Sequence, residues 1–305
     1  MSHSTPKVSV VIPTYNRGTT IRDSVGSVLR QTFTDLELIV VDDCSSDNTL
    51  DVLRDIQDPR LRIERHDVNK GSSAARNTGI RVAKAPYVAF QDSDDEWLPT
   101  KLERQVAALE AAGPKYKAVY CGMLVMGTEE ILQKKGVIRP SVRYVPSAQI
   151  DVVEGDLLSS LLRYSVISTQ TLMVQRDVLN AIGGFDEQLR ALEDWECAIR
   201  ISQTSLIAHI VDPLVIQRFS HDSITQSIDK RVNAREQIVK KHMGLLSADK
   251  QLLRSHYEVI AGGYQLTGEY ARSRGWYLKA LRLSPFRPKI WVNLVRSYVA
   301  RGNRR

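Results

Sequence analysis

Short apolar runs alternate with amphipathic helical segments in the first part of the chain. Val8–Ile12 and Leu36–Val41 are near-continuous β-branched and aliphatic runs, which end at Pro13 and at Asp42. Between them, apolar residues recur at helical spacing over residues 21–29, so the pattern predicts strand, helix, strand. Strands that are apolar on both faces are typical of a parallel sheet covered by helices. The chain is therefore predicted to have an α/β fold.

The alternation continues through the middle of the chain and then stops. Further strands are predicted at Leu61–Glu64, Tyr87–Phe90, Ala118–Val125 and Thr171–Val174, with two short ones at 206–211 and 214–219. Helices are predicted over residues 21–29, 49–56, 74–83, 100–113 and 193–202, and near residue 178. Thr20 and Asp23 are spaced as a capping box for the first of them. The polar stretch 127–147 indicates a hairpin or a mobile loop.

From about residue 232 onward the pattern is helical throughout. We therefore expect a mostly parallel, Rossmann-like central sheet flanked by helices in a domain over residues 1–230. A basic helical C-terminal extension is expected over residues 231–305.

Length and composition exclude several classes of protein. The 305 residues are 43% hydrophobic and 25% charged, which is typical of a globular protein rather than a disordered or collagen-like one. Cys44, Cys121 and Cys197 lie far apart, which argues against a disulfide framework and a structural zinc site. No apolar run reaches the roughly 20 residues that cross a bilayer, and the N-terminus lacks a secretory pattern. These features predict a cytoplasmic protein.

Positive charge is concentrated at the C-terminal end. The net charge is +7, and residues 270–305 contain ten Lys or Arg and no acid, so the rest of the chain is slightly acidic. The same segment contains several aromatic residues: Trp276, Tyr277, Phe286, Trp291 and Tyr298. This composition favours peripheral contact with the inner face of a membrane that holds a lipid-linked acceptor. A packed helical appendage with a solvated basic face explains it equally well.

Three carboxylates follow the predicted strand Tyr87–Phe90. Asp92, Asp94 and Asp95 would lie at the carboxyl end of a strand, where α/β sheets bind their ligands. Carboxylates this close repel one another unless a cation neutralises them, so a divalent ion that bridges them to a substrate diphosphate is expected. A capped loop with solvated acids, leading to the helix after Pro99, is the alternative.

Two other segments are candidates for nucleotide binding. Asp43, after the strand Leu36–Val41, could accept hydrogen bonds from a nucleobase or a ribose hydroxyl, although the following residues also suit a helix N-cap. Asn69–Asn77 is rich in glycine and serine and opens a helix, so its backbone N–H groups, with Lys70 and Arg76, favour a diphosphate. It lacks GxGxxG and GxxxxGK[ST], which argues against a dinucleotide fold and a kinase-type loop. An ordinary helix cap remains the alternative.

Asp194 and His221 are candidates for the chemistry itself. Asp194 is expected near a helix start, where the dipole keeps a carboxylate ionised as a general base requires. Ordinary acidic enrichment of a first helical turn is the alternative. His221 follows the two short strands and could contact the metal or the leaving group, although a lone histidine is more often structural.

Taken in order, these segments resemble the family 2 glycosyltransferases, which are inverting enzymes with the GT-A fold. The resemblance extends over residues 6 to about 225. The matching segments are Val8–Arg17, Ser27–Phe33, Val40–Thr49, Ala75–Ile80, Gln91–Trp97, Gly184–Glu187 and Glu193–Asp194. Cys44 departs from the family pattern, in which Gly or Asn is frequent, but it removes no reacting group.

The resemblance implies roles for individual residues. The nucleotide base and ribose, most often of uridine, would be held by Pro13, Thr14, Tyr15 and Asp43. Asp92, Ser93 and Asp94 would be the DXD element that binds Mn²⁺ or Mg²⁺ and the donor diphosphate, with Asp95 as an alternative ligand. Asp194 would be the catalytic base of the ED motif.

The resemblance therefore implies transfer of a sugar from a nucleotide-diphosphate donor to a hydroxyl of a carbohydrate or lipid-linked acceptor, in polysaccharide, lipopolysaccharide or glycolipid assembly. No nucleic-acid partner is expected. A sugar-phosphate nucleotidyltransferase also combines an α/β sheet, acids and a metal, but its glycine-rich N-terminal loop is absent. A non-catalytic protein that binds polyanions through the basic tail is the other alternative. That alternative leaves both acidic strand ends without a purpose.

Overall fold

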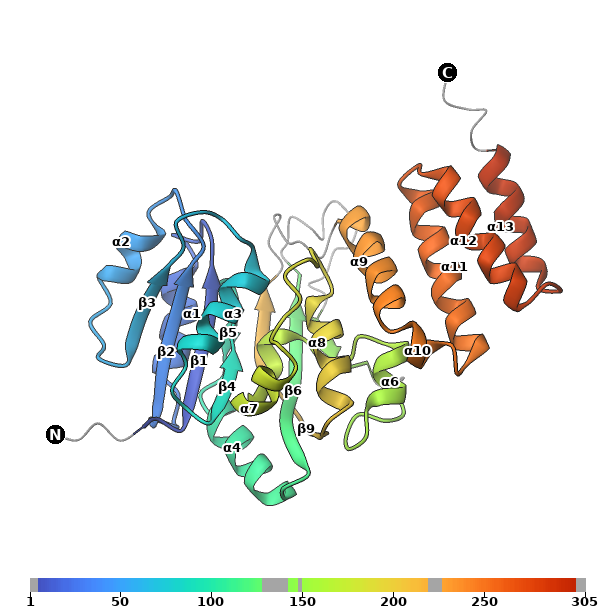
Figure 1. The fold of residues 1–305 in the computed structure, drawn as a ribbon. Coiled ribbons are helices and arrows are strands. Elements are labelled where there is room, and N and C mark those ends of the chain that lie inside the picture. Colours follow the sequence, from blue (N-terminus) through green and yellow to red (C-terminus); the bar gives the residue numbers. More distant parts are fainter. Residues whose placement is uncertain (1–4, 128–141, 148–149, 219–226, 300–305) are drawn as a thin grey trace. The chain divides into compact units, whose positions relative to one another are not determined.

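Figure 1 shows the computed structural model, which describes residues 5–127, 142–147, 150–218 and 227–299. The chain divides into two compact units. The first comprises the chain up to Glu187 together with Glu193–Asp222, and the second comprises Gln188–Leu192 and the chain from Ser223 onward. The predicted boundary at residue 230 lies inside helix α9 (Ile228–Lys241), and a functional division at that point stays a prediction.

The first unit is built on a nine-stranded sheet with the order β3-β2-β1-β4-β8-β6-β9-β5, in which β7 pairs with β6. Four of its strands are parallel neighbours: β1 (Val8–Thr14), β2 (Leu36–Asp42), β3 (Leu61–Arg65) and β4 (Tyr87–Phe90). The others are β5 (Glu96–Trp97), β6 (Tyr116–Met126), β7 (Val142–Val145), β8 (Leu172–Gln175) and β9 (Leu206–Arg218). Strand β8 is antiparallel to both β4 and β6. The α/β fold is confirmed. Beyond β4 the sheet contains both kinds of pairing, because β6 is parallel to β9 and antiparallel to β7 and β8.

Helices pack around this sheet. They are α1 (Ile21–Leu29), α2 (Thr49–Arg54), α3 (Ser72–Val82), α4 (Lys101–Ala112), α6 (Leu158–Arg163), α7 (Arg176–Ala181) and α8 (Glu193–Ser202). A 3₁₀ turn, Thr169–Thr171, precedes β8. Helix α3 lies so close to β1 that a Cβ atom on Gly79 would stand 2.3 Å from Cγ1 of Val11, so glycine is required there.

Two local predictions differ from the structure. The two short strands predicted at 206–211 and 214–219 are one strand, β9, because register shifts beside Gly122 of β6 absorb the irregularity at Pro213. Thr20 precedes α1 but makes no side-chain cap, because its hydroxyl donates to the carbonyl of Ser93 instead. Within the stretch 127–147, the described part includes β7, antiparallel to β6, in agreement with a hairpin.

The second unit contains α9, α10 (Met243–Leu246), α11 (Lys250–Leu266), α12 (Tyr270–Leu283) and α13 (Pro288–Val299). From Ile228 to Val299 it is built of helices, as predicted. A Cβ atom on Gly263 of α11 would stand 2.1 Å from Cγ2 of Val232 in α9, so α9 and α11 pack closely at that point. Across the described residues of both units, no helix is long and apolar enough to span a membrane.

Candidate active site

Three strand ends meet at one edge of the sheet in the first unit. Thr14 of β1 pairs with Asp42 of β2, and Val11 of β1 pairs with Phe90 of β4. Because these strands are parallel, the residues that follow them all emerge at the same edge. The acids predicted after β2 and after β4 therefore share this edge.

Asp43, just after β2, is buried and binds the loop that precedes α3. Its Oδ1 accepts a hydrogen bond from the backbone N–H of Lys70 at 2.9 Å, and its Oδ2 accepts one from Gly71 at 2.7 Å. Nδ1 of His66 lies 2.7 Å from the same Oδ1, and Nε2 of His66 lies 2.9 Å from Oγ1 of Thr78. The carboxylate is thus held by several protein donors. His66 follows β3 outside any recognisable motif, so no sequence pattern predicts its role.

The residues after β1 lie next to Asp43. The backbone N–H of Asp43 donates to the carbonyl of Thr14 at 2.8 Å. Pro13 and Thr14 are buried, whereas Tyr15 is 46% exposed, and Asn16 has a positive φ of 51°. Oγ1 of Thr14 is buried without a hydrogen-bond partner in the described chain. The four residues predicted to hold the nucleotide are therefore together in space; their contact with a nucleotide stays a prediction.

Helix α1 fixes the backbone of the acidic loop after β4. The hydroxyl of Ser24 donates to the carbonyl of Asp92 at 2.9 Å, and the hydroxyl of Thr20 donates to the carbonyl of Ser93 at 2.9 Å. Thr20 thus holds the loop instead of capping its own helix. Because the backbone is fixed, the side chains of the acidic run project from a rigid base.

Asp92 and Asp94 are each opposed by one arginine. Nη2 of Arg76 lies 2.9 Å from Oδ1 of Asp92, and Nη2 of Arg17 lies 3.5 Å from Oδ2 of Asp94. Burial and the negative charge of Asp92 raise the pKa of Asp94, and Arg17 offsets this only in part. The two carboxylates supply the hard oxygen ligands that Mn²⁺ and Mg²⁺ take, and a cation would relieve their repulsion. The donor set therefore fits such an ion.

Asp95 has a different environment from its two neighbours. Its Oδ2 accepts from Nε2 of Gln170 at 2.9 Å, and its Oδ1 accepts from the backbone N–H of Arg218 at 3.3 Å. Burial, followed by the charges of the neighbouring acids, raises the pKa of Asp95 well above its usual range. Gln91 closes the turn by donating Nε2 to the carbonyl of Asp95 at 2.8 Å. These contacts favour a structural role for Asp95 over metal ligation.

Arg76 connects the acidic loop to the start of α8. Its Nη1 lies 3.0 Å from Oε1 of Glu193, while its Nη2 contacts Asp92. The side chain is buried, and its guanidinium carbon lies 5.4 Å from the centroid of the Phe185 ring. Phe185 in turn packs edge to face on Phe90 of β4, with ring centroids 5.1 Å apart. The geometry thus places Arg76 between two acidic segments rather than in an open anion site.

Asp194, the second residue of α8, lies beside this ion pair. Its Oδ1 accepts a hydrogen bond from the backbone N–H of Trp195 at 2.7 Å. Burial raises the pKa of Asp194 to about 7, and the adjacent charge of Glu193 adds to the rise, while the Trp195 N–H and Arg76 act against it. A carboxylate with a pKa near 7 is suited to accept a proton at neutral pH. Trp195 itself is buried and packs in the core.

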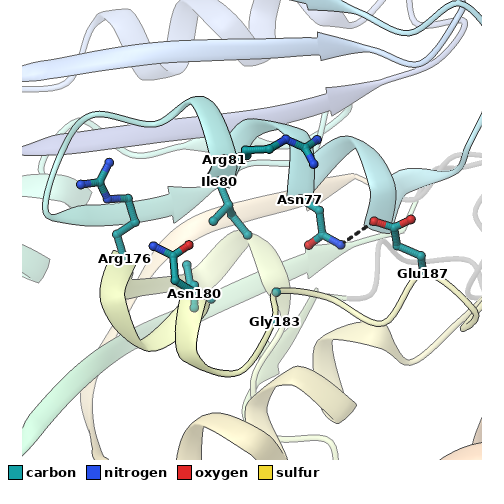
Figure 2. Close-up of a pocket in the computed structure, with 9 residues that line it drawn as sticks. Asn77, Ile80, Arg81, Arg176, Asn180, Gly183 and Glu187 are labelled. Atoms are coloured by element: carbon teal, nitrogen blue, oxygen red, sulfur yellow. Dashed lines mark hydrogen bonds between the residues drawn. The ribbon is translucent and has the colours of Figure 1, made fainter.

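The Gly184–Glu187 loop is held by Asn77 of α3, as Figure 2 shows. Asn77 accepts from the N–H of Phe185 at 2.8 Å and donates to the carbonyl of Phe185 at 2.9 Å and to Oε1 of Glu187 at 2.8 Å. Gly184 has a φ of +70°, and a Cβ atom there would stand 2.3 Å from Oδ1 of Asn77, so only glycine fits. This clamp fixes Phe185 beneath Arg76.

A pocket of about 360 Å³ opens beside the clamp, between α3 and α7 (Figure 2). Its lining residues come from both helices and from the glycine turn: Asn77, Ile80, Arg81, Arg176, Leu179, Asn180, Gly183, Gly184 and Glu187. None of the predicted catalytic or metal-binding residues lines it. The pocket is therefore separate from the acidic cluster.

The metal ligands were predicted to be Asp92 and Asp94, with His221 as a further candidate. His221 lies outside the described residues. Within the described ranges, no three His, Cys, Asp or Glu side chains converge tightly enough to form a metal cluster by themselves. A metal at Asp92 and Asp94 would therefore need ligands from a substrate as well, as Mg²⁺ at diphosphates commonly does.

Comparison with known proteins identifies related glycosyltransferases. A family model described as glycosyl transferase family 2 matches residues 9–146, which include the ends of β1, β2 and β4. The chain is 42% identical over 102 residues to the Escherichia coli UDP-Glc:alpha-D-GlcNAc-diphosphoundecaprenol beta-1,3-glucosyltransferase WfgD. That match covers 33% of this chain and 40% of the relative, so the chain spans about two fifths of its length. An uncharacterized glycosyltransferase of Rickettsia prowazekii is 28% identical over 92% of this chain and 84% of its own.

Solved structures share the fold. Residues 1–349 of Staphylococcus aureus TarS, in complex with UDP-GlcNAc, superpose with a TM-score of 0.71 at 19% identity, covering 96% of this chain and 89% of that one. A mannosyltransferase of Pyrobaculum calidifontis, in complex with GDP-Man and Mn²⁺, superposes with a TM-score of 0.59 over 97% of this chain and 87% of that one. The GT-A-like fold predicted from the resemblance is confirmed. The family model over residues 9–146, the relatives and the fold all support a family 2 glycosyltransferase.

Proposed function

We propose that this protein is an inverting, metal-dependent glycosyltransferase that moves a sugar from a UDP-sugar to an acceptor hydroxyl. The proposal depends above all on one observation. Arg76 lies within 2.9 Å of Asp92 and within 3.0 Å of Glu193, so the acids after β4 and those at the start of α8 belong to one site. The match of residues 9–146 to the family model favours this activity over a nucleotidyltransferase or a non-catalytic polyanion-binding protein.

The donor would be held at the edge formed by β1, β2 and β4. Pro13, Thr14 and Tyr15 are the proposed nucleotide contacts, and the unpartnered Thr14 hydroxyl can accept or donate a hydrogen bond there. Asp43 would act mainly by fixing the Lys70–Gly71 backbone, since its oxygens already accept hydrogen bonds from it.

Asp92 and Asp94 would hold Mn²⁺ or Mg²⁺, and the backbone contacts from α1 at Asp92 and Ser93 keep the loop in place. The ion supplies positive charge for the departing diphosphate when it is bound. TarS binds UDP-GlcNAc and the Pyrobaculum enzyme binds GDP-Man with Mn²⁺, which supports a nucleotide-sugar donor and a metal for the family fold.

Asp194 is the proposed general base. Its carboxylate would take the proton of the acceptor hydroxyl while that oxygen forms a bond to the anomeric carbon. The bond from that carbon to the diphosphate breaks, and the nucleoside diphosphate leaves with the bonding electrons. A single displacement inverts the anomeric centre. The raised pKa of about 7 matches a group that must be deprotonated at rest and protonated after transfer.

The acceptor is proposed to be lipid-linked, in polysaccharide or glycolipid assembly at the cytoplasmic side of a membrane. WfgD is named for a diphosphoundecaprenol-linked acceptor, which supports this acceptor class. Peripheral membrane contact and a cytoplasmic location are parts of the same proposal.

A nucleotide-sugar screen tests the donor and the metal. Thermal shift would be measured with UDP-glucose, UDP-GlcNAc and GDP-mannose, each with Mn²⁺, with Mg²⁺ and with EDTA. We expect stabilisation by a UDP-sugar that EDTA abolishes. Equal stabilisation by the same sugar in EDTA would remove the metal from the proposal.

An Asp194→Asn variant tests the base. Turnover is expected to fall by about 10² to 10⁴, the usual contribution of general base catalysis, with donor affinity unchanged. Asp177→Asn is a matched control, because Asp177 is also the second residue of its helix, α7, and its Oδ1 also accepts from the next backbone N–H, at 2.8 Å. Near-normal turnover in Asp194→Asn, or an equal loss in Asp177→Asn, would overturn the assignment.

A further inference from the structure

Helix α13 carries apolar residues on two different faces. Ile290, Leu294 and Ser297 are buried, and they form the face through which α13 packs in its own unit, chiefly against α12 (Figure 1). A second apolar group is 49–69% exposed: Trp291, Val292, Val295, Tyr298 and Val299. At about 100° per residue these five form one continuous stripe along the helix, here called the α13 stripe.

Cations border the α13 stripe on both sides. The guanidinium carbon of Arg274 lies 4.7 Å from the centroid of the Tyr298 ring, and Nη1 of Arg274 donates to the carbonyl of Ser297 at 3.2 Å. On the other border, helical spacing puts Lys289 and Arg296 next to Val292 and Val299, and both are exposed. An exposed apolar stripe flanked by positive charge, here Arg274 on one border and Lys289 and Arg296 on the other, is typical of helices that lie in a membrane interface.

The turn before α13 extends this surface. Phe286 is 94% exposed, and Nε1 of Trp291 donates to the carbonyl of Pro285 at 2.7 Å, which fixes the indole next to the turn. Arg287 lies in the same turn, but its charge is opposed by Glu258, whose Oε1 lies 3.3 Å from Nε of Arg287. Residues 270–299 contain no Asp or Glu, so no acid of α12 or α13 offsets the positive border.

We infer that the α13 stripe, with Phe286, docks on an anionic membrane surface. The cations would approach lipid phosphates while the aromatic and aliphatic side chains enter the headgroup region, where amphipathic aromatic rings are favoured. A second copy of the chain is a poorer occupant, because it would bring two borders of like charge together. This inference rests on the peripheral membrane contact of the proposed function and deepens it by naming the surface that makes the contact. It does not depend on the chemistry at Asp194.

Vesicle co-sedimentation of the full-length protein tests the inference. The protein would be mixed with two kinds of phosphatidylcholine vesicles. One contains no anionic lipid, and the other contains about 30% phosphatidylglycerol, which gives a negative surface potential. We expect binding to the anionic vesicles only, weakened by salt. Lys289→Glu/Arg296→Glu should lower the partition coefficient by at least about tenfold, and Trp291→Ser/Phe286→Ser should lower it by a similar factor.

Matched controls are available in the same helical unit. Lys230→Glu/Lys250→Glu makes the same change in net charge at exposed first-turn positions of α9 and α11, and Leu266→Ser removes an apolar side chain that is 75% exposed. Both should bind vesicles like the unaltered protein. Unchanged binding by the α13 variants, an equal loss in the controls, or a dimer that depends on Trp291 without vesicle binding would each overturn the inference. Donor binding by the α13 variants should be normal, which separates this result from any failure of the proposed function.

Discussion

Asp43 and Asp94 follow two strands that both pair with β1, yet their environments differ. Asp43 is surrounded by donors, namely two backbone N–H groups and a His66 nitrogen, all within 2.9 Å. Asp94 has Arg17 at 3.5 Å and the negative charge of Asp92 beside it. The comparison teaches that acids at the same sheet edge serve different purposes. One is satisfied inside the protein and organises a loop, whereas the other is proposed to bind a ligand.

Asp94→Asn should produce the largest effect. Removing a ligand oxygen and its charge is expected to weaken metal-dependent binding of the donor by at least about a hundredfold. Thermal stability should stay equal or rise, because a repelled, partly buried charge is removed. Isothermal titration with a UDP-sugar and Mn²⁺ measures the affinity. Unchanged affinity would show that the acids after β4 are structural and would break the comparison.

Asp43→Asn should show the opposite profile. The amide –NH₂ of the asparagine replaces an oxygen that accepts a hydrogen bond from the backbone N–H of Lys70 or Gly71. One of these buried N–H groups then faces another donor and loses its acceptor. The free energy of unfolding should fall by about 2 kcal/mol, as for other buried groups left unsatisfied. Urea denaturation measures this, with Asp94→Asn as the paired control. If Asp43→Asn is as stable as the unaltered protein, the organising role of Asp43 is wrong.

The pH dependence of Asp194 sharpens the comparison next. Its pKa of about 7 in the folded protein lies above the ordinary 3.8, so the folded state retains a proton that the unfolded chain releases. Stability should therefore decline as pH rises from about 4 to 7 and then level off. The rate should rise about tenfold per pH unit below pH 7, because only the deprotonated carboxylate acts as base.

Rate profiles and urea denaturation at several pH values measure both effects. Asp194→Asn is the control, and its stability should lose this decline with pH. A rate that is flat from pH 5 to 8 in the unaltered protein would contradict the assignment.

Cys44→Gly should have the smallest effect on the free energy of unfolding. Cys44 directly follows Asp43 in the sequence. Cys44 has a φ of +66°, a left-handed conformation that costs a non-glycine residue about 1–2 kcal/mol. Part of the relief is lost to the greater freedom of glycine in the unfolded chain, so a net gain of about 0.5–1 kcal/mol is expected. Differential scanning calorimetry measures it. Cys44→Ala keeps the strain and should show no gain, and an equal gain in both variants would exclude backbone strain as the cause.

The sequence by itself determined the strands β1 to β4, the helices between them and the edge at which the acids lie. These features depend on local patterns, namely apolar runs, helical spacing and the residues that end each strand. Asp43, Asp92 and Asp94 were predicted as site residues for the same reason, since each follows a predicted strand. Asp194 lies near a predicted helix start, and its role was implied by the family resemblance.

Only the tertiary structure decided which of these residues act together. Arg76 pairs with Glu193 across 117 positions in sequence, and His66 joins Asp43 to Thr78, so no local pattern could reveal either contact. The sequence suggested Arg76 as an anion ligand, and the fold instead buries it between two acids. Likewise, the sequence showed that the tail is basic and aromatic, but which side chains of α13 face outward depends on which of them α12 covers. Long-range packing determines these partners, because it sets the distances between side chains that are far apart in sequence, and local sequence patterns do not contain those distances.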